Sequence, residues 1–533
     1  MWSARQSREM GRRVAGLLGG LLVGLLLVAA PAAAAFVDPI NLSNSASISE
    51  RPAIAVNKAG RVFVAWKEAS PPNFSIRFRR SKPTLGTCGG GLEFDEEEPV
   101  TELWAGTVAP SGPALAATDD DEVFVAWQAS SGVLFRRSTD AGKTFAPAGP
   151  PLGLSNGSSN VPSVAAEKAV RGVFVAWSNG SAIHFVKSTD LGATFGSPAI
   201  LASPMFTRKL QKPSVAAGLG KVFVAWEEQE QVGLFARVVS IGYKTFTWTA
   251  DPGTASTVPL STGVPSSVLG PNGPNLAFGD DTLAAAFADP SAVYHRSSGP
   301  DGTSFSPALT DAPDPLTSGL VFPLDARVAR RNGSTLVAWA QSAAGNTGIR
   351  VRLLGNGAMG PGPVTSTEGA RSPAAAIDST GRLLVAWQGR EPSDPLKPVQ
   401  DEIYLSYSGG TGGDEPNAWV EMTPQTLNAK TITQGQGVFT LRIRFMDGSA
   451  VDYPTSLAVN GNPAVTPLRS SLVDTDGNGS LDTLEVKIKR QDLQFEETAL
   501  TAAQGDGNYP VKVKGNMKDG RCFSGDGEVR IIH

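Results

Sequence analysis

Histidine and positive charge are scarce in this chain, and their scarcity excludes several classes of function. Three His residues are present, and the 46 Lys and Arg residues are outnumbered by 50 Asp and Glu, which gives a net charge of −4. The chain lacks the basic field that attracts a phosphate backbone, so we expect no nucleic-acid partner. His184 and His295 lie far from any Gly-x-Ser-x-Gly elbow, so neither a Ser-His-Asp triad nor a histidine metal site is expected.

Cysteine and tyrosine are also rare, with two and six residues among 533. Cys88 and Cys522 lie near the two ends of the mature chain, and an oxidising compartment permits a disulfide between them. The sequence does not give the Cα separation that this bond requires, so two free thiols are the alternative.

One long apolar run is found near the N-terminus, and it is too short for a membrane helix. Residues 14–30 follow a segment with four arginines and precede Pro31 and a run of alanines that ends at Ala35. This order is typical of a secretory signal peptide, and a bilayer span requires ~20 apolar residues. We predict a signal peptide over residues 1–35, a secreted, periplasmic or cell-surface protein, and no membrane span after its removal.

A repeat is the dominant feature of what is present. With 59 Gly and 39 Pro the chain is rich in turns, as all-β proteins are. The string Val-Phe-Val-Ala-Trp or a variant recurs at residues 62–66, 123–127, 173–177, 222–226, 283–287, 336–339 and 383–387. Its final aromatic recurs at intervals from 48 residues (Trp339 to Trp387) to 61 (Trp66 to Trp127), which suits a four-stranded blade.

Each string has the same neighbours. A short strand of small residues led by Pro precedes it, as at Pro52 and Pro162, and an alternating strand such as residues 133–137 follows it. The sequence therefore predicts an all-β protein with about seven propeller blades over residues 36–422. Residues 38–43 and 419–422 both resemble outer strands, and either could complete the last blade.

The turn after the third strand carries a specific motif. Residues 138–145 and 188–195 both read Ser-x-Asp-x-Gly-x-x-Phe, and degenerate forms follow at 240–246 and 297–305. Short polar side chains can bond the turn amides there, and Gly supplies a positive φ. The motif resembles the Asp box, or BNR repeat, of the sialidase-like propeller superfamily, a resemblance that covers residues 36–422. In that family the box lies at the periphery, which implies structural roles for Asp140 and Asp190.

The same resemblance implies where a catalytic site would lie. A sialidase requires three arginines for the substrate carboxylate, an Asp acid and a Tyr–Glu pair. Arg51 stands near the family's first arginine position, and Arg371 keeps an Arg-x-Pro spacing in the seventh repeat. Tyr404 is the tyrosine candidate, and the sequence shows no evident Glu partner for it. Sialidases have six blades, and the seven repeats here argue against this chemistry.

A second pattern replaces the repeat near residue 423. Alternating strands over residues 423–533 predict a small β-sandwich. Oxygen donors with the spacing of an EF-hand loop occur at Asp474, Asp476, Asn478, Ser480, Asp482 and Glu485. They predict a structural Ca²⁺ site in a β-domain, with an Asp/Gly turn without metal as the alternative. The region resembles a C-terminal calcium-loop accessory domain of secreted bacterial proteins, a likeness carried by residues 473–474 and 527–530.

Two functions remain for this sequence. The first is a secreted, monomeric Asp-box propeller that binds a glycan or an extracellular protein through its axial pocket and loops. The alternative is a glycoside hydrolase of the exo-sialidase type, with Arg51, Arg371 and Tyr404 as the candidates.

Overall fold

A computed structural model describes the strands of the chain and most of their connections. The described residues are 36–82, 92, 94, 100–156, 161–204, 208–232, 235–262, 272–289, 292–307, 314–315, 323–343, 346–355, 359–365, 369–390, 401–408, 417–423, 426–428, 438–445, 454–459, 468–474, 483–489, 507–517 and 522–532. Among them, no helical segment has the length and apolar character required for a membrane crossing.

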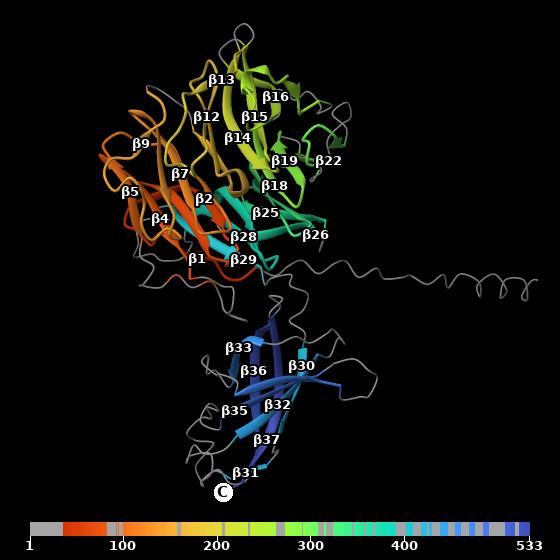
Figure 1. The fold of residues 1–533 in the computed structure, drawn as a ribbon. Coiled ribbons are helices and arrows are strands. Elements are labelled where there is room, and N and C mark those ends of the chain that lie inside the picture. Colours follow the sequence, from red (N-terminus) through yellow and green to blue (C-terminus); the bar gives the residue numbers. More distant parts are fainter. Residues whose placement is uncertain are drawn as a thin grey trace, which may run out of the picture. The chain divides into compact units, whose positions relative to one another are not determined.

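Seven antiparallel sheets form the blades of a β-propeller (Figure 1). The Pro-led small-residue strands supply the first strand of each sheet: β2 (Ile48–Val56), β6 (Ala114–Ala117), β10 (Ser163–Glu167), β14 (Lys209–Gly218), β18 (Asn272–Gly279), β23 (Pro323–Arg331) and β27 (Arg371–Ile377). The repeated string supplies the second: β3 (Val62–Ser70), β7 (Val123–Ala129), β11 (Gly172–Ser178), β15 (Lys221–Val232), β19 (Thr282–Ala288), β24 (Ser334–Ala343) and β28 (Leu383–Arg390).

Alternating and outer strands complete each sheet, as the sequence predicts. The third strands are β4 (Asn73–Arg80), β8 (Gly132–Ser138), β12 (Ile183–Ser188), β16 (Phe235–Thr247), β20 (Val293–Ser298), β25 (Asn346–Gly355) and β29 (Asp401–Tyr407). The outer strands of the first six blades are β5 (Thr101–Gly106), β9 (Leu152–Gly153), β13 (Ala199–Ala202), β17 (Val258–Pro259), β21 (Phe305–Ser306) with β22 (Asp314–Pro315), and β26 (Met359–Thr365).

The repeated string within each second strand is apolar because both of its faces are covered by neighbouring blades. In β3, Val62, Val64 and Trp66 belong to a core cluster shared with the seventh blade. Phe63 and Ala65 belong to a cluster shared with the second blade, and all five side chains are fully buried. A strand that is covered on both faces has no polar side, which explains why the string does not alternate.

The N-terminal segment closes the ring. The first strands contact one another in order, and β27 lies against β2. Strand β1 (Ile40–Asn41) is the outer strand of the seventh blade, where it pairs with β29. The Leu42 amide continues this contact with a 2.7 Å hydrogen bond to the carbonyl of Ile403. Of the two predicted outer strands, residues 38–43 therefore complete the last blade, and residues 419–422 belong to another sheet.

The turns at residues 138–145 and 188–195 have the same internal structure. Ser138 Oγ donates to Asp140 Oδ1, and the Gly142 amide donates to Ser138 Oγ. The amide and hydroxyl of Thr144 donate to the two oxygens of Asp140. Residues 188–194 repeat these four hydrogen bonds, which are 2.6–2.9 Å long in the two turns. Gly142 has a φ of 77°, so the predicted need for glycine is confirmed.

The motif's aromatic residue packs on the preceding blade. Phe145 lies edge-on to Phe78 with 4.9 Å between ring centroids, and Phe195 repeats this contact one blade later. The degenerate copy at 297–305 also forms a turn, in which Asp301 accepts hydrogen bonds from Thr303 and Ser304. The prediction of a similar turn at residues 240–246 is wrong, because those residues lie within β16. Without an aspartate to hold the turn amides, the third strand continues.

The remaining strands form one eight-stranded sheet. They are β30 (Asn417–Thr423), β31 (Thr426–Asn428), β32 (Val438–Phe445), β33 (Pro454–Val459), β34 (Arg469–Val473), β35 (Thr483–Lys489), β36 (Gly507–Met517) and β37 (Cys522–Ile532). Their order is β33-β36-β37-β30-β32-β35-β34, with β31 beside β37. Parallel pairing of β30 with β37 joins the two groups of antiparallel strands. The predicted domain boundary after residue 422 falls within β30.

Candidate functional site

Bulges near the start of the first strands distinguish one end of the ring, called here the bulge end. The pairing with the second strand shifts there in five blades. At each shift one residue has a positive φ of 45–61°: Arg51, Lys212, Gly273, Asp325 and Ser372. Such a backbone is strained for residues other than glycine, and bulges re-aim side chains next to binding sites. The bulge end therefore presents a different side chain from each of these blades.

Two arginine side chains and the backbone amide of a third arginine meet in one hydrogen-bond network at this end, between the seventh and first blades. The Asp401 carboxylate accepts from Arg371 Nη2 at 2.5 Å and from Arg390 Nε at 3.1 Å. Gln388 Nε2 donates to Asp401 Oδ2 at 3.1 Å, and Gln388 Oε1 accepts from the Arg51 amide at 3.3 Å. We call these five residues the Arg–Asp cluster.

The strand register explains why these side chains meet. Arg390 is the last residue of β28 and lies directly opposite Asp401, the first residue of β29. Arg371 opens β27 and lies opposite Gln388. Ring closure then places Arg51 of β2 beside Gln388. One edge of the seventh blade thus collects residues that are widely separated in the sequence.

The charge of the Arg–Asp cluster is unbalanced. Two arginine side chains contact one aspartate, whose side chain is 8% exposed, whereas those of Arg371 and Arg390 are 43% and 49% exposed. Arg51 is exposed as well. A guanidinium that bonds a buried carboxylate with one edge retains other N–H donors that suit a carboxylate, sulfate or phosphate. The cluster can therefore bind an anion at its exposed side.

A second buried carboxylate at the bulge end joins the fourth and fifth blades. The Glu227 side chain is fully buried, accepts from the Gly273 amide at 2.6 Å and pairs with Lys212 at 2.9 Å. Sequence reasoning missed Glu227 and Gln388. The signal was a polar residue directly after the string's last aromatic, the position that both of them occupy.

Tyr404 lies away from the Arg–Asp cluster. It is 5% exposed and stacks on Trp387, with 6.0 Å between centroids, within the core between the sixth and seventh blades. The structure thus brings Arg51 and Arg371 into one network and leaves Tyr404 outside it.

The aspartates of the repeated turns are structural acceptors. Desolvation opposes the charge on Asp190, but hydrogen bonds from Thr194 and Ser188 outweigh it and lower the pKa of Asp190 to about 2. Asp140 has the same partners in its own turn, and they lower its pKa as well. Both carboxylates are ionised at neutral pH, which suits a hydrogen-bond acceptor and not a general acid.

Two of the six predicted calcium ligands are in the described part of the chain. Asp474 is exposed and directly follows β34, and Glu485 lies in β35. Glu485 accepts a 2.8 Å hydrogen bond from Arg442, its direct neighbour in β32. Asp476, Asn478, Ser480 and Asp482 lie outside the described residues, as does Cys88, so the predicted disulfide with Cys522 stays a prediction.

Comparison with known proteins identifies no family for this chain. No protein-family model and no curated protein matches the chain. Among solved structures, a protein of unknown function from Dyadobacter fermentans is 14% identical, with 70% of this chain and 99% of that chain covered at a TM-score of 0.41. The α-L-arabinanase of Penicillium chrysogenum is also 14% identical, with 70% of this chain and 98% of that chain covered at a TM-score of 0.40. An α-L-arabinofuranosidase of Podospora anserina is 10% identical, with 70% of this chain and 96% of that chain covered at a TM-score of 0.32.

These similarities carry no argument about function, since every identity is far below 25% and every TM-score is below 0.5. The sheets themselves define the chain as a β-propeller protein with an additional C-terminal β-sheet. Its function must be argued from its own residues.

Proposed function

We propose that the protein is an exported Asp-box propeller that binds an acidic glycan at the Arg–Asp cluster. The observation that supports this most directly is the convergence of the Arg371 and Arg390 side chains on Asp401, which Gln388 connects to the backbone amide of Arg51. Sugar carboxylates and sulfates are planar or multidentate anions, which the arginine fork matches better than a lysine does. The ligand class is therefore a glycan that carries uronic acid, sialic acid or sulfate groups.

Binding without turnover agrees best with the carboxyl groups present. Glycoside hydrolysis by the usual route uses a pair of carboxyl groups, one on each side of the scissile bond. Asp401 is the one carboxylate of the Arg–Asp cluster, and Arg371 and Arg390 already engage it. Asp325 is a further carboxylate at the bulge end, and it accepts a 3.5 Å hydrogen bond from Ser372, the neighbour of Arg371. We therefore expect a binding protein.

The test is binding of the mature protein to a glycan array, followed by calorimetry with one sialylated, one sulfated and one uncharged oligosaccharide. We expect Arg390→Ala to weaken binding of the acidic glycan about 10–100-fold, because a charge-assisted hydrogen bond contributes about 1.5–3 kcal/mol. Arg77→Ala is the matched control, since Arg77 pairs with Glu102 at 3.0 Å between the third and outer strands of the first blade. The proposal would be contradicted if the uncharged glycan bound as tightly as the acidic glycans and Arg390→Ala left the affinity unchanged.

Exo-sialidase activity is the second candidate, and the arginines of the Arg–Asp cluster favour it. Incubation with a fluorogenic sialoside tests it directly. If the wild type releases the fluorophore and Arg371→Ala does not, the protein is a hydrolase and the proposed binding role is replaced. We expect no turnover, because Tyr404 is buried in the core and does not reach the Arg–Asp cluster.

The loop between β34 and β35 is proposed to bind calcium. The two strands pair up to Val473 and Thr483, and the exposed Asp474 directly follows the first of them. The oxygen donors at alternate loop positions support a Ca²⁺ site. Glu485 fits less well, because Arg442 engages its carboxylate.

Thermal unfolding of the full mature chain with and without CaCl₂ tests this site. We expect Ca²⁺ to raise the unfolding temperature of the C-terminal sheet, and Asp476→Asn to remove the rise. Glu485→Gln should retain most of it if Arg442 is the partner of Glu485. No rise with millimolar Ca²⁺ would contradict the site.

Export is proposed to follow cleavage after Ala35. N-terminal sequencing of the protein recovered outside the cytoplasm should then begin at Phe36. An intact N-terminus in that fraction would contradict the signal peptide.

A further inference from the structure

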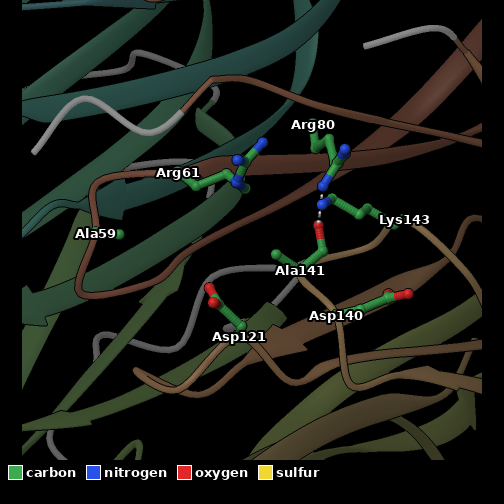
Figure 2. A pocket seen from close by; sticks show the side chains of 7 residues that line it. All are labelled: Ala59, Arg61, Arg80, Asp121, Asp140, Ala141 and Lys143. Carbon is green, nitrogen blue, oxygen red and sulfur yellow. Dashed lines mark hydrogen bonds between the residues drawn. The ribbon is translucent and has the colours of Figure 1, made fainter. Parts of the chain in front are cut away.

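A pocket of about 300 Å³ lies between the first two blades, beyond the far end of β2 from Arg51. Arg61, Arg80, Lys143, Asp121, Asp140 and Ala141 line it (Figure 2). Three cationic side chains thus surround a space at which two carboxylates are also present. The proposed glycan site is at the other end of the ring, so the two are independent.

The repeat provides an internal comparison that separates the structural residues from the others. Arg80 lies opposite Phe63 in the strand register, and Arg137 lies opposite Phe124 at the same place in the second blade. Arg80 donates to the carbonyl of Ala141, and Arg137 donates to that of Leu191 in the next turn, both at 3.1 Å. Arg80 therefore has a repeated function in joining adjacent blades.

Lys143 has no such counterpart, whereas Arg61 has one in the seventh blade. Arg61 directly precedes the second strand of the first blade, where its amide donates to Asn57 Oδ1 and its Nη1 donates to the carbonyl of Ser81. Glu122 holds this place in the second blade, and Arg382 holds it in the seventh, where its amide donates to Asp378 Oδ1. Lys143 follows Gly142 of its turn, whereas Ala193 follows Gly192 in the turn with the same hydrogen bonds. Because that turn forms with alanine, the lysine is not needed for folding of this turn.

The two carboxylates of the pocket are engaged elsewhere. Asp140 accepts from Ser138 and Thr144 within its turn, and Figure 2 shows its carboxylate directed away from Arg61. Asp121 accepts from the side-chain amide of Asn57. The pocket lining thus has three cations and two carboxylates, and both carboxylates already accept hydrogen bonds from other residues.

We propose that this pocket binds a sulfate or phosphate group, either as the free anion or as an ester, with Lys143 and Arg61 as the recognition residues. Two cations on different blades can contact different oxygens of one tetrahedral anion. The ligand would also connect the loop before β3 with the turn after β8. This site is new relative to the Arg–Asp cluster and does not rest on the proposed function.

The experiment is calorimetry on the full mature chain at constant ionic strength. The probes are inorganic sulfate, inorganic phosphate, a sulfated monosaccharide and its uncharged parent sugar. Lys143→Ala is the main variant, because the equivalent turn has alanine naturally. Lys58→Ala is the matched control, since it removes one exposed lysine from the loop of Arg61 without altering the pocket lining.

We expect sulfate or phosphate to bind, Lys143→Ala to weaken the binding about tenfold and Lys58→Ala to leave it unchanged. Tighter binding of the sulfated sugar than of free sulfate would identify an ester as the ligand, and equal binding would identify the anion. Arg390→Ala should not affect these constants, which separates this site from the Arg–Asp cluster.

Two results would overturn the proposal. One is the absence of heat from every anionic probe. The other is a lower unfolding temperature of Lys143→Ala with unchanged anion affinity, which would make Lys143 a structural residue.

Discussion

Replacement of Asp190 by alanine tests whether the repeated turns stabilise the fold or take part in function. The carboxylate accepts three hydrogen bonds, from Ser188 Oγ at 2.7 Å, the Thr194 amide at 2.9 Å and Thr194 Oγ1 at 2.6 Å. A buried bond to a charged group contributes about 1.5–3 kcal/mol, but this turn is near the surface and solvent screens it. We expect Asp190→Ala to lower the free energy of unfolding by about 2 kcal/mol in all.

Asparagine provides a graded comparison at the same position. Its Oδ1 can still accept from Ser188 and the Thr194 amide, and its Nδ2 can donate to the Thr194 hydroxyl. Only the charge is lost, so Asp190→Asn should lower the free energy of unfolding by about 1 kcal/mol. Chemical denaturation followed by tryptophan fluorescence measures both variants, since the buried tryptophans lie in the second strands.

The pH dependence of this effect has a defined sign. The pKa of Asp190 falls from 3.8 to about 2 on folding, so its contribution is complete above pH ~4 and is lost as the pH falls toward 2. The difference in stability between the wild type and Asp190→Ala should therefore narrow over that range. Unchanged stability of Asp190→Ala at neutral pH, combined with lost glycan binding, would refute the structural interpretation.

Three further substitutions test the ring. Glu227→Ala leaves the buried Gly273 amide without its acceptor and Lys212 without its partner. We expect the free energy of unfolding, measured by chemical denaturation, to fall by about 2 kcal/mol. An unchanged free energy of unfolding would contradict a role for Glu227 in joining blades. Leu42→Ala, at a fully buried position, should lower the free energy of unfolding by about 3 kcal/mol and expose the N-terminal segment to limited proteolysis; wild-type protection would contradict closure by this segment. Gly142→Ala should lower the free energy of unfolding by about 3 kcal/mol in the same assay, because φ is 77° and the new Cβ would lie 2.6 Å from the Phe78 ring. An unchanged free energy of unfolding would contradict this close contact.

The sequence predicted the blades well because the relevant signals are local and repeated. An apolar string flanked by a small-residue strand and an alternating strand is visible in each repeat, and each of these segments forms the expected strand. The turn motif was equally readable where its aspartate is present. It failed at residues 240–246, because spacing of serine and aromatic residues does not show whether a strand ends.

The candidate site was only partly predictable. Arg51 and Arg371 were identified from their place before a proline, but Gln388, Arg390 and Asp401 were not. The bond between Arg51 and Gln388 joins residues 337 positions apart, and nothing local encodes such a contact. The fully buried Glu227 was missed for the same reason, since its partner amide belongs to the next blade.

The sequence by itself thus determined the repeat, the number of blades and the chemistry of each turn, because these depend on side chains within one blade. The tertiary structure decided which segment closes the ring, which arginines meet at Asp401 and which cations surround the pocket at Lys143. Each of these depends on contacts between blades, and such contacts exist only after the ring has closed.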